Sequence, residues 1–446
     1  MPKLSYSQTL DYLFARLPMF QRIGAAAFKK DLTNTLRLCA ELGNPQDSYE
    51  SVHIAGTNGK GSTSHLVASM LQEAGKKVGL YTSPHYKDFR ERVRVNGQMM
   101  SEAFVVDFVE RMRPLIEEIE PSFFEITVAM AFEYFRQEGV DIAVVEVGMG
   151  GRLDSTNVLR RVRLSIVTNI DLDHQQFLGG TRREIAGEKA GIFKRGVPAI
   201  VGERHAETDA VFEQRAQEVG TGVVFVQDFI QLRQVQVDYE AGMATYEAFS
   251  ERPNMSGQLR FESPLLGAYQ TKNIATAVLA LGLILPNSAD AQQAAQRGIA
   301  NVVRNTGIMG RWQILQSSPF LVIADAGHNE QGIGEVQRGI EEIGCDQLFF
   351  VFGMVRDKAA EKLLGKLPQS QAQYYFCAAN IPRARPADEL QTEANFRFGL
   401  AGEHYASVRE AYAQALADAA AYKDANPDKK PLVFVGGSIF VIAEIL

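Results

Sequence analysis

The segment GTNGKGS, residues 56–62, has the residue types and spacing of a phosphate-binding loop. It follows the apolar segment VHIAG and precedes a segment with apolar residues at helical spacing, so we expect a strand, a loop and a helix. Backbone N–H groups and the helix dipole favour an anion at such a helix start. Lys60 adds a cation, and Ser62 is expected at the N-cap, where its hydroxyl can instead face metal or phosphate.

The loop departs from the common pattern G-x-x-x-x-G-K-[ST], because position 54 is Ile54 and position 61 is Gly61. The alternative is a tight strand–helix turn with a surface lysine. The next expected strand, KVGLYTS, ends in Thr82 and Ser83 rather than in an acidic residue that could bind a ribose, which argues against a dinucleotide fold. We therefore predict a variant phosphate loop.

Three further residues could act on a phosphorylated ligand. Glu146 ends the expected strand 141–148, and a carboxylate at that edge of a parallel sheet lies where ligands bind; its oxygens suit Mg²⁺. The alternative is a solvated strand end. His174 lies in DLDH, expected at the same edge, and by itself would be a substrate contact or a neighbour of metal ligands, since histidine is uncommon for Mg²⁺. Lys189 by itself is a helix lysine with a solvated side chain.

Aromatic and cationic residues supply a candidate organic-substrate pocket. In SFFE, Phe123 and Phe124 could stack on a flat heterocycle and Glu125 could hydrogen-bond to its ring. The alternative is the start of a core helix, because FFEITVAMAFEYF has helical apolar spacing. Arg152, in GGRLD, can pair with a carboxylate or a phosphate.

The elements that must position these residues alternate between strand and helix. Apolar runs at 141–148 and 164–170 indicate a parallel sheet buried on both faces, after helices at 5–17 and 28–42. Residues 222–262 alternate in polarity and predict a small antiparallel patch. Strand–helix alternation restarts near residue 305, so we predict an α/β protein with domains 1–304 and 305–446.

Composition limits the class of protein. The 446 residues are 46% apolar and 22% charged, with a net charge of −7, which argues against a general nucleic-acid binder. Cys39, Cys345 and Cys377 are too widely spaced for a metal cluster or a disulfide framework. We find neither a signal peptide nor a membrane span, and expect a cytoplasmic protein.

Many ordered motifs resemble the Mur ligase superfamily, and within it folylpolyglutamate synthase/dihydrofolate synthase. Besides AGTNGKGS they are YTSPH, RERVRVNG, SFFE, VEVGMGGRLDSTN, TNIDLDHQQFLG, EKAGIFK, GRWQ, DAGHN and GGSIF. The resemblance covers nearly the whole chain. It implies a phosphate-loop domain of the Mur ligase central type and a C-terminal Rossmann-like ligase domain.

The resemblance also implies a reaction and a set of site residues. ATP phosphorylates a carboxylate, and the glutamate amine then attacks the acyl phosphate to form an amide. The implied substrates are ATP, L-glutamate and dihydropteroate or a reduced folate, with two Mg²⁺ ions. The implied ATP-binding residues are Thr57, Asn58, Gly59, Lys60, Gly61, Ser62, Asn273, Arg311 and Asp325. The implied metal ligands are Ser83, Glu146, His174 and a carbamylated Lys189, and the implied catalytic residues are Lys60, His174 and Lys189.

The remaining residues concern the substrate and the second domain. The implied substrate-binding residues are Ser122, Phe123, Phe124, Glu125, Arg152 and His328, the last of which could equally be structural. ATP is expected between the two domains, with Lys358 as a further residue facing that cleft. We expect a monomer that binds no nucleic acid and no membrane.

Two rival functions remain open. A ligase for a cell-wall nucleotide precursor is disfavoured, because the phosphate loop begins by residue 56 and leaves no room for a separate preceding nucleotide-binding domain. The second rival function is a nucleotide-dependent switch that does not catalyse ligation. The sequence leaves open whether dihydropteroate, folylpolyglutamates or both are substrates; a bifunctional enzyme is the expectation.

Overall fold

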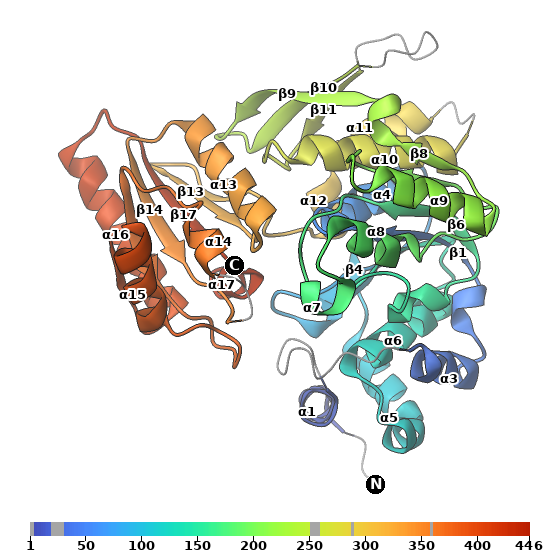
Figure 1. The fold of residues 1–446 in the computed structure, drawn as a ribbon. Helices are drawn as coiled ribbons and strands as arrows, with labels where there is room; N and C mark the ends of the chain where they lie inside the picture. Colours follow the sequence, from blue (N-terminus) through green and yellow to red (C-terminus); the bar gives the residue numbers. More distant parts are fainter. Residues whose placement is uncertain (1–3, 19–30, 250–258, 287–289, 357–359) are drawn as a thin grey trace. The chain divides into compact units, whose positions relative to one another are not determined.

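The computed structural model describes residues 4–18, 31–249, 259–286, 290–356 and 360–446 (Figure 1). Lys358 lies outside the described residues. The chain divides into two compact units. Unit 1 comprises residues 1–233, 246–263 and 270–308, and unit 2 comprises residues 234–245, 264–269 and 309–446.

The main sheet of unit 1 has eight strands in the order β4-β3-β2-β5-β1-β6-β7-β8. The strands are β1 (Glu50–Ala55), β2 (Val78–Tyr81), β3 (Val93–Val95), β4 (Gln98–Met99), β5 (Ile142–Glu146), β6 (Val162–Val167), β7 (Ala199–Val201) and β8 (Val223–Phe225). All neighbours from β2 to β8 pair in parallel, whereas β3 and β4 pair antiparallel at one edge.

The central strands are buried on both faces, as their continuous apolar runs predict. Every residue of β5 is buried, and so are all residues of β1 after Glu50. Two expectations were wrong in detail. β6 ends at Val167 rather than at residue 170, and β8 joins the main sheet in parallel rather than the antiparallel patch. Its short apolar segment pairs with β7, which alternation of polarity could not reveal.

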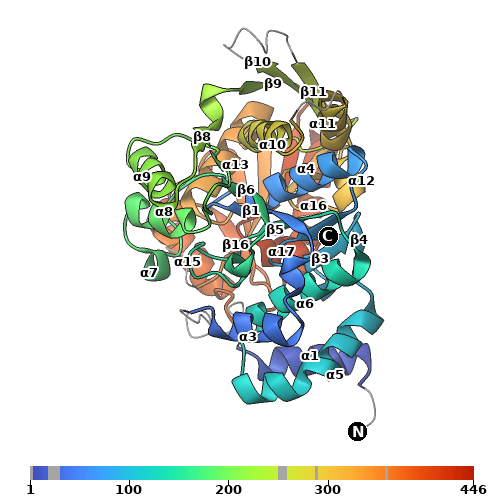
Figure 2. The ribbon, with the colours of Figure 1, turned by 90° about the vertical axis from the view of Figure 1, so that its right-hand side faces the viewer.

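Helices cover both faces of this sheet (Figure 2). They are α1 (Tyr6–Arg16), α3 (Thr33–Glu41), α4 (Lys60–Glu73), α5 (Glu102–Ile119), α6 (Phe123–Glu138), α7 (Gln175–Leu178), α8 (Arg182–Ala190), α9 (Asp209–Val219), α10 (Gln270–Ile284), α11 (Ala291–Ala300) and α12 (Val302–Thr306). The short 3-10 helices are η2 (Pro45–Asp47), η3 (Phe89–Arg92), η4 (Ser155–Val158) and η5 (Val226–Asp228). α4 packs against α10, α11 and α12; α6 packs against α3 and α5; and α8 packs against α9.

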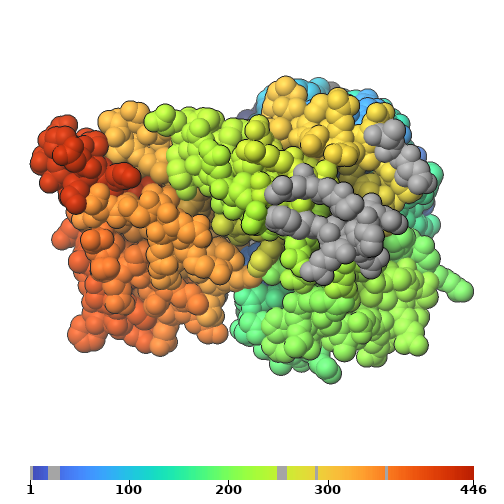
Figure 3. All heavy atoms as spheres, turned by 90° about the horizontal axis from the view of Figure 1, so that it is seen from above, coloured from blue at the N-terminus to red at the C-terminus, as the bar shows by residue number. Residues whose placement is uncertain are grey.

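A second sheet has three strands in the order β11-β10-β9. They are β9 (Gln231–Asp238), β10 (Met243–Phe249) and β11 (Leu259–Ser263). A connection of residues 239–242 is too short for a parallel crossover, so β9 and β10 pair antiparallel. The residues of β9 are exposed or half-buried, and this part of the chain is visible in yellow-green on the face viewed in Figure 3. The predicted antiparallel patch is therefore present, without β8.

Unit 2 contains a six-stranded sheet in the order β12-β13-β17-β14-β15-β16. Its strands are β12 (Gln313–Gln316), β13 (Leu321–Asp325), β14 (Gln347–Phe352), β15 (Ala372–Phe376), β16 (Gly402–His404) and β17 (Pro431–Gly436). Its helices are α13 (Glu330–Ile343), α14 (Ala360–Leu364), α15 (Ala387–Phe398), α16 (Val408–Ala425) and α17 (Ile439–Ala443). β12 pairs antiparallel and the other strands pair in parallel, which confirms the predicted α/β class.

No helix in the described part of the chain is both long and apolar enough to cross a membrane.

Candidate active site

Three neighbouring parallel strands, β5, β1 and β6, end at one edge of the main sheet. Ile54 pairs with Glu146, and Ala55 pairs with Val167. The segments that follow these strands therefore emerge side by side, at the edge where ligands bind in open α/β sheets. They carry the phosphate loop, the segment after Glu146, and the segment that leads to His174.

The phosphate loop requires glycine at two positions. Gly56 has φ +149° and Gly59 has φ +82°. A Cβ atom on Gly56 would lie 1.8 Å from Thr168 Oγ1, and one on Gly59 would lie 2.2 Å from Asn273 Oδ1. Gly59 is the N-cap of α4, and Ser62 is inside the first turn. The prediction of Ser62 as N-cap is therefore wrong, because the left-handed backbone of Gly59 starts the helix earlier.

The segment after β6 holds the loop in place. Asn58 N donates to Asn169 Oδ1 at 2.8 Å, Thr57 N donates to Asn169 O at 2.9 Å, and Thr168 Oγ1 donates to Asn58 O at 2.6 Å. Sequence reasoning did not assign Thr168 or Asn169 to the site. The available signal was the polar run TNID, which directly follows an apolar strand at the expected ligand edge.

Gly59→Ala should weaken ATP binding about tenfold or more, because the added methyl meets Asn273 and the residue must keep a left-handed backbone. Gly75→Ala is the matched control: Gly75 has φ +80°, but nothing lies within 4 Å of its Cβ position. Titration calorimetry with ATP would measure both variants. Equal affinities for the two would contradict the steric requirement.

Two lysines converge on the start of the loop. Lys60 Nζ donates to Gly56 O at 3.1 Å and to Thr57 O at 3.2 Å, and Lys189 Nζ donates to Gly56 O at 2.8 Å. Lys189 is only 4% exposed. Burial, aided by the charge of Lys60, lowers its pKa to about 7, although Asp173 and Asp154 act in the opposite direction. The interpretation of Lys189 as a solvated helix lysine is therefore wrong.

Ser83 and Glu146 lie together at the ends of the adjacent strands β2 and β5. Ser83 N donates to Glu146 Oε2 at 3.0 Å, and Glu146 is buried. The Ser83 hydroxyl and the Glu146 carboxylate are oxygen donors of the kind that Mg²⁺ takes. His174 is the N-cap of α7 with φ 51°, beyond the end of β6. Its backbone N donates to Asp173 Oδ1 at 2.8 Å.

The expected metal ligands are chemically mixed. Among the described residues, no group of three or more His, Cys, Asp or Glu side chains is arranged to hold a metal ion. The expected set contains only two such side chains, Glu146 and His174; the other two members are Ser83 and Lys189. Lys189 can supply oxygen donors only after its amine is modified, which requires the neutral form that its lowered pKa favours.

The SFFE segment starts α6, and its four residues differ in their surroundings. Ser122 is the N-cap of α6 and forms a capping box with Glu125. Phe123 is buried, with its ring 5.8 Å from that of Phe89 and 5.3 Å from the guanidinium of Arg92. Phe123 therefore belongs to the core.

Phe124 and Glu125 are better placed for a ligand. Phe124 is half-buried, 6.2 Å from the Tyr81 ring, and packs against Gly148. Glu125 Oε2 accepts from Ser122 N at 2.6 Å. Glu125 Oε1 is buried and has no hydrogen-bond partner among the described residues. An unpaired buried carboxylate oxygen is costly, which fits an acceptor for a donor group on a ligand.

Arg152 lines a cavity of about 120 Å³ in the loop after Glu146. The other lining residues are Met149, Gly150, Gly151, Leu153, Phe177, Leu178 and Glu188. Arg152 Nη2 donates to Glu188 Oε1 at 2.8 Å, and this hydrogen bond raises the Arg152 pKa. With its side chain 57% exposed, the guanidinium can exchange Glu188 for an incoming anion.

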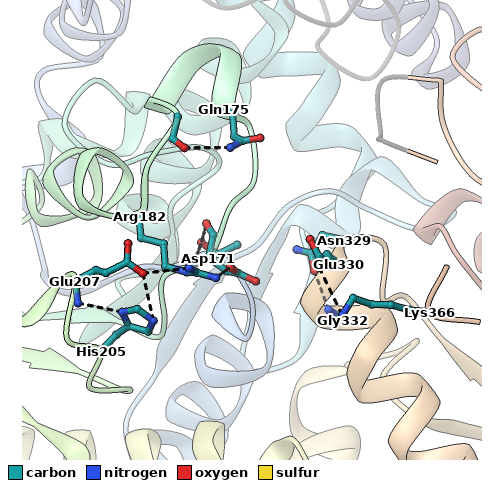
Figure 4. A network of polar contacts seen from close by, with 11 residues as sticks. Asp171, Gln175, Arg182, His205, Glu207, Asn329, Glu330, Gly332 and Lys366 are labelled. Atoms are coloured by element: carbon teal, nitrogen blue, oxygen red, sulfur yellow. Dashed lines mark hydrogen bonds and ion pairs between the residues drawn. The ribbon is translucent and has the colours of Figure 1, made fainter. Parts of the chain in front are cut away.

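Figure 4 shows the ion pairs that Arg182 forms with Asp171 and Glu207 in unit 1. Arg182, the first residue of α8, contacts Asp171 Oδ1 at 2.9 Å through Nη2 and Glu207 Oε1 at 3.2 Å through Nη1. The Asp171 backbone N and O both bond to Thr57 Oγ1, at 3.0 and 3.1 Å. α8 thus supports the phosphate loop at both ends, since Lys189 bonds to Gly56 directly.

Arg182→Ala should raise the KM for ATP by a few fold, with a smaller change in the free energy of unfolding, because a half-exposed ion pair contributes about 1 kcal/mol or less. Arg204→Ala is the control, since Arg204 likewise forms two ion pairs, with Asp209 and Asp228. Steady-state kinetics would compare them. An unchanged KM in Arg182→Ala would show that the loop does not depend on this support.

In unit 2, Asp325 ends β13 and organises the turn that follows. Its Oδ1 accepts from Gly327 N at 2.8 Å, and its Oδ2 accepts from Trp312 N at 2.8 Å and from Tyr269 Oη at 2.5 Å. Burial raises its pKa. Arg311 Nη1 donates to Gly310 O at 3.2 Å, and His328 Nδ1 lies 3.0 Å from Ala326 O. Asn273, from α10, belongs to unit 1, where it lies over Gly59.

The chain matches two known protein families over the residues of this site. The chain matches the family described as Mur ligase middle domain over residues 54–281, and the family described as Mur ligase, glutamate ligase domain, over residues 310–426. The first match contains the phosphate loop, Glu146, His174, Lys189 and Asn273. The second contains Arg311, Asp325 and His328.

Curated relatives and solved structures extend over the whole chain. A probable bifunctional folylpolyglutamate synthase/dihydropteroate synthase from Haloferax volcanii is 35% identical over 99% of this chain and 50% of its own length. The dihydrofolate synthase/folylpolyglutamate synthase of Escherichia coli is 33% identical over 88% of this chain and 85% of its own length. The chain thus spans about half the length of the Haloferax volcanii relative.

The structure of E. coli FolC in complex with DHPP and ADP has a TM-score of 0.82 at 30% identity, covering 100% of this chain and 98% of that one. The Mycobacterium tuberculosis folylpolyglutamate synthase complexed with ADP has a TM-score of 0.84 at 27% identity, covering 99% of this chain and 97% of that one.

Proposed function

The chain belongs to the folylpolyglutamate synthase/dihydrofolate synthase family of Mur ligases, and on that premise we propose that it is an ATP-dependent ligase that adds L-glutamate to dihydropteroate, folyl-poly-γ-glutamates or both. ADP and phosphate are the other products. The observation that carries the proposal is that a phosphate loop and a buried lysine meet at Gly56 O, at the sheet edge that also ends in Glu146.

The reaction has two steps. A carboxylate oxygen of the folate substrate attacks the γ-phosphorus of ATP, the bond to ADP breaks, and an acyl phosphate forms. The amine of glutamate then attacks the acyl carbon, phosphate leaves, and the nitrogen loses a proton to give the amide. Negative charge moves in both steps, so fixed cations and N–H donors contribute most to catalysis. Lys60 supplies a cation to the phosphates, and the backbone of residues 57–62 supplies N–H donors.

Mg²⁺ fits the residues present at the sheet edge. Ser83 and Glu146 would hold one ion, and His174 with a carbamylated Lys189 would hold the second, supplying charge neutralisation at the transferred phosphoryl group. Carbamylation joins CO₂ to the neutral amine of Lys189 and releases a proton. Burial and the nearby Lys60 favour that neutral form.

The folate substrate is proposed to lie beside α6. Phe124 offers a half-buried ring face, and Glu125 Oε1 offers an acceptor without a partner among the described residues. Ser122 and Phe123 support these two residues by capping and packing the helix start. Arg152, freed from Glu188, would bind a carboxylate of the substrate.

Residues that are proposed to bind ATP are found in each of the two domains, 1–304 and 305–446. Thr57 to Ser62 and Asn273 would bind the phosphates, and Arg311 and Asp325 would contribute from the C-terminal domain, with His328 near the substrate. The hydrogen bonds of Asp325 to Trp312 and Gly327 fix the turn that would face the ligand. We further propose a cytoplasmic monomer.

Parallel assays with dihydropteroate and with tetrahydrofolate test this function. Each contains ATP, Mg²⁺ and L-glutamate, and follows both phosphate release and the mass of the product. The expected result is a gain of one glutamate residue with stoichiometric phosphate release that depends on both co-substrates. ATP hydrolysis that needs neither co-substrate would instead indicate a nucleotide switch, and would overturn the proposal.

A further inference from the structure

His53 is a buried polar residue for which the proposed reaction has no use. It lies in β1, three positions before Gly56, and is completely buried. Its Nε2 lies 2.8 Å from Thr156 Oγ1. Thr156 belongs to η4, in the segment that follows Glu146. His53 therefore connects the strand of the phosphate loop to the segment that carries Arg152.

The hydrogen bonds determine which ring nitrogen carries the proton. Thr156 Oγ1 donates its single hydrogen to Asp154 Oδ1 at 2.5 Å, so it must accept from His53. The proton is then on Nε2. Burial, aided by the charge of Lys194, lowers the pKa of His53 to about 3, so the ring is neutral at physiological pH. Nδ1 is buried and has no hydrogen-bond partner in the described part of the chain.

Asp154 connects the Thr156 side chain to the backbone of the same segment through hydrogen bonds. Its Oδ1 accepts from Thr156 N at 3.0 Å, and its Oδ2 accepts from Met149 N at 2.9 Å. The carboxylate thereby closes residues 149–156 into a fixed loop. Arg152 lies within this loop, and Gly148, just before it, packs against Phe124.

We propose that His53 is a positioning residue, which acts through Thr156 and Asp154 to fix the loop 148–156 and so to orient Arg152 and the surface beside Phe124 for the folate substrate. The identification of this substrate as a folate rests on the proposed function. The phosphate loop is held separately, by Thr168, Asn169 and Asp171. Loss of the His53 hydrogen bond should therefore affect the folate substrate much more than ATP.

Four variants separate positioning from packing. His53→Leu removes the hydrogen bond to Thr156 with little change in volume, and should raise the KM for the folate substrate about tenfold, the size expected for one buried hydrogen bond. Thr156→Val also removes the hydrogen bond to Asp154, and should raise that KM at least as much. The KM for ATP should stay within about twofold. His53→Gln keeps an N–H donor and Thr156→Ser keeps the hydroxyl, so both should stay near wild type.

Two comparisons sharpen this test. The double variant His53→Leu/Thr156→Val should be no worse than Thr156→Val alone, because Thr156→Val already removes the hydrogen bond to His53. Val52→Ala, on the same strand, lowers stability by leaving a cavity but breaks no polar link, and should leave both KM values unchanged. Equal effects on both KM values, or additive effects in the double variant, would overturn the positioning role.

A measurement independent of activity tests the tautomer. Nitrogen-15 NMR of protein labelled at its seven histidines, with His53→Gln for assignment, should show a neutral ring protonated at Nε2 from pH 5 to 8. A proton on Nδ1, or an imidazolium at pH 7, would overturn the proposal even if the His53→Leu variant fails to fold. Absent ligase activity in wild-type protein would count against the proposed function and leave this result standing.

Discussion

Lys189→Ala should fold and yet lose nearly all ligase activity, with a fall in kcat of about 10²–10³-fold, because the site would lose both oxygen donors of the proposed carbamate. As an ammonium group, Lys189 would repel Mg²⁺. The buried amine beside Lys60 has its pKa lowered to about 7, which makes the neutral, CO₂-reactive form available at physiological pH. Steady-state kinetics and the unfolding midpoint should be measured on the same preparation.

Chemical rescue and pH distinguish a carbamate from a structural lysine. Short carboxylic acids should partly restore Lys189→Ala, since they place oxygens where the carbamate was. Lys189→Arg should remain inactive, because it keeps the charge and cannot be carbamylated. In wild-type protein stripped of CO₂, reactivation by bicarbonate should slow as the pH falls below about 7, where the amine becomes protonated. Substantial activity in Lys189→Arg would show that the lysine is an ordinary cation.

Lys60→Ala is expected to lower kcat by about 10²–10³-fold at saturating ATP, as the loss of one preorganised electrostatic contact does. Lys60 Nζ donates hydrogen bonds to Gly56 O and Thr57 O, which places its charge beside the first two residues of the loop. Lys60→Arg should recover only part of the rate, since its larger planar head does not fit the same two carbonyls.

The control for Lys60 is Lys76→Ala, an exposed lysine beyond the far end of α4, which should leave the rate unchanged. Calorimetry should show that Lys60→Ala still binds ADP, so that the loss lies in the transition state rather than in nucleotide affinity. Turnover near the wild-type value at saturating ATP would contradict the role of Lys60.

Much of the fold follows from local sequence. Continuous apolar runs such as those of β1 and β5 predict buried parallel strands, because a strand covered by helices on both faces cannot alternate in polarity. The same logic placed β8 in the wrong sheet, since a strand of residues 223–225 carries too little pattern to show which sheet it joins. Similarly, the N-cap of α4 depended on the left-handed backbone of Gly59, not on the hydroxyl of Ser62.

The sequence by itself determined the phosphate loop, the α/β class and the carboxylate at a strand end, because each depends on residues close together in the chain. Only the tertiary structure decided that Lys189 is buried against Gly56, that Asn273 lies over Gly59, and that His53 reaches Thr156. These partners are far apart in sequence. Lys189 and His53 reach their partners because β1 lies between β5 and β6, and Asn273 reaches Gly59 because α10 packs against α4. Hydrophobic periodicity fixes which face of a strand is buried, but the order of strands in a sheet comes from packing of the whole domain.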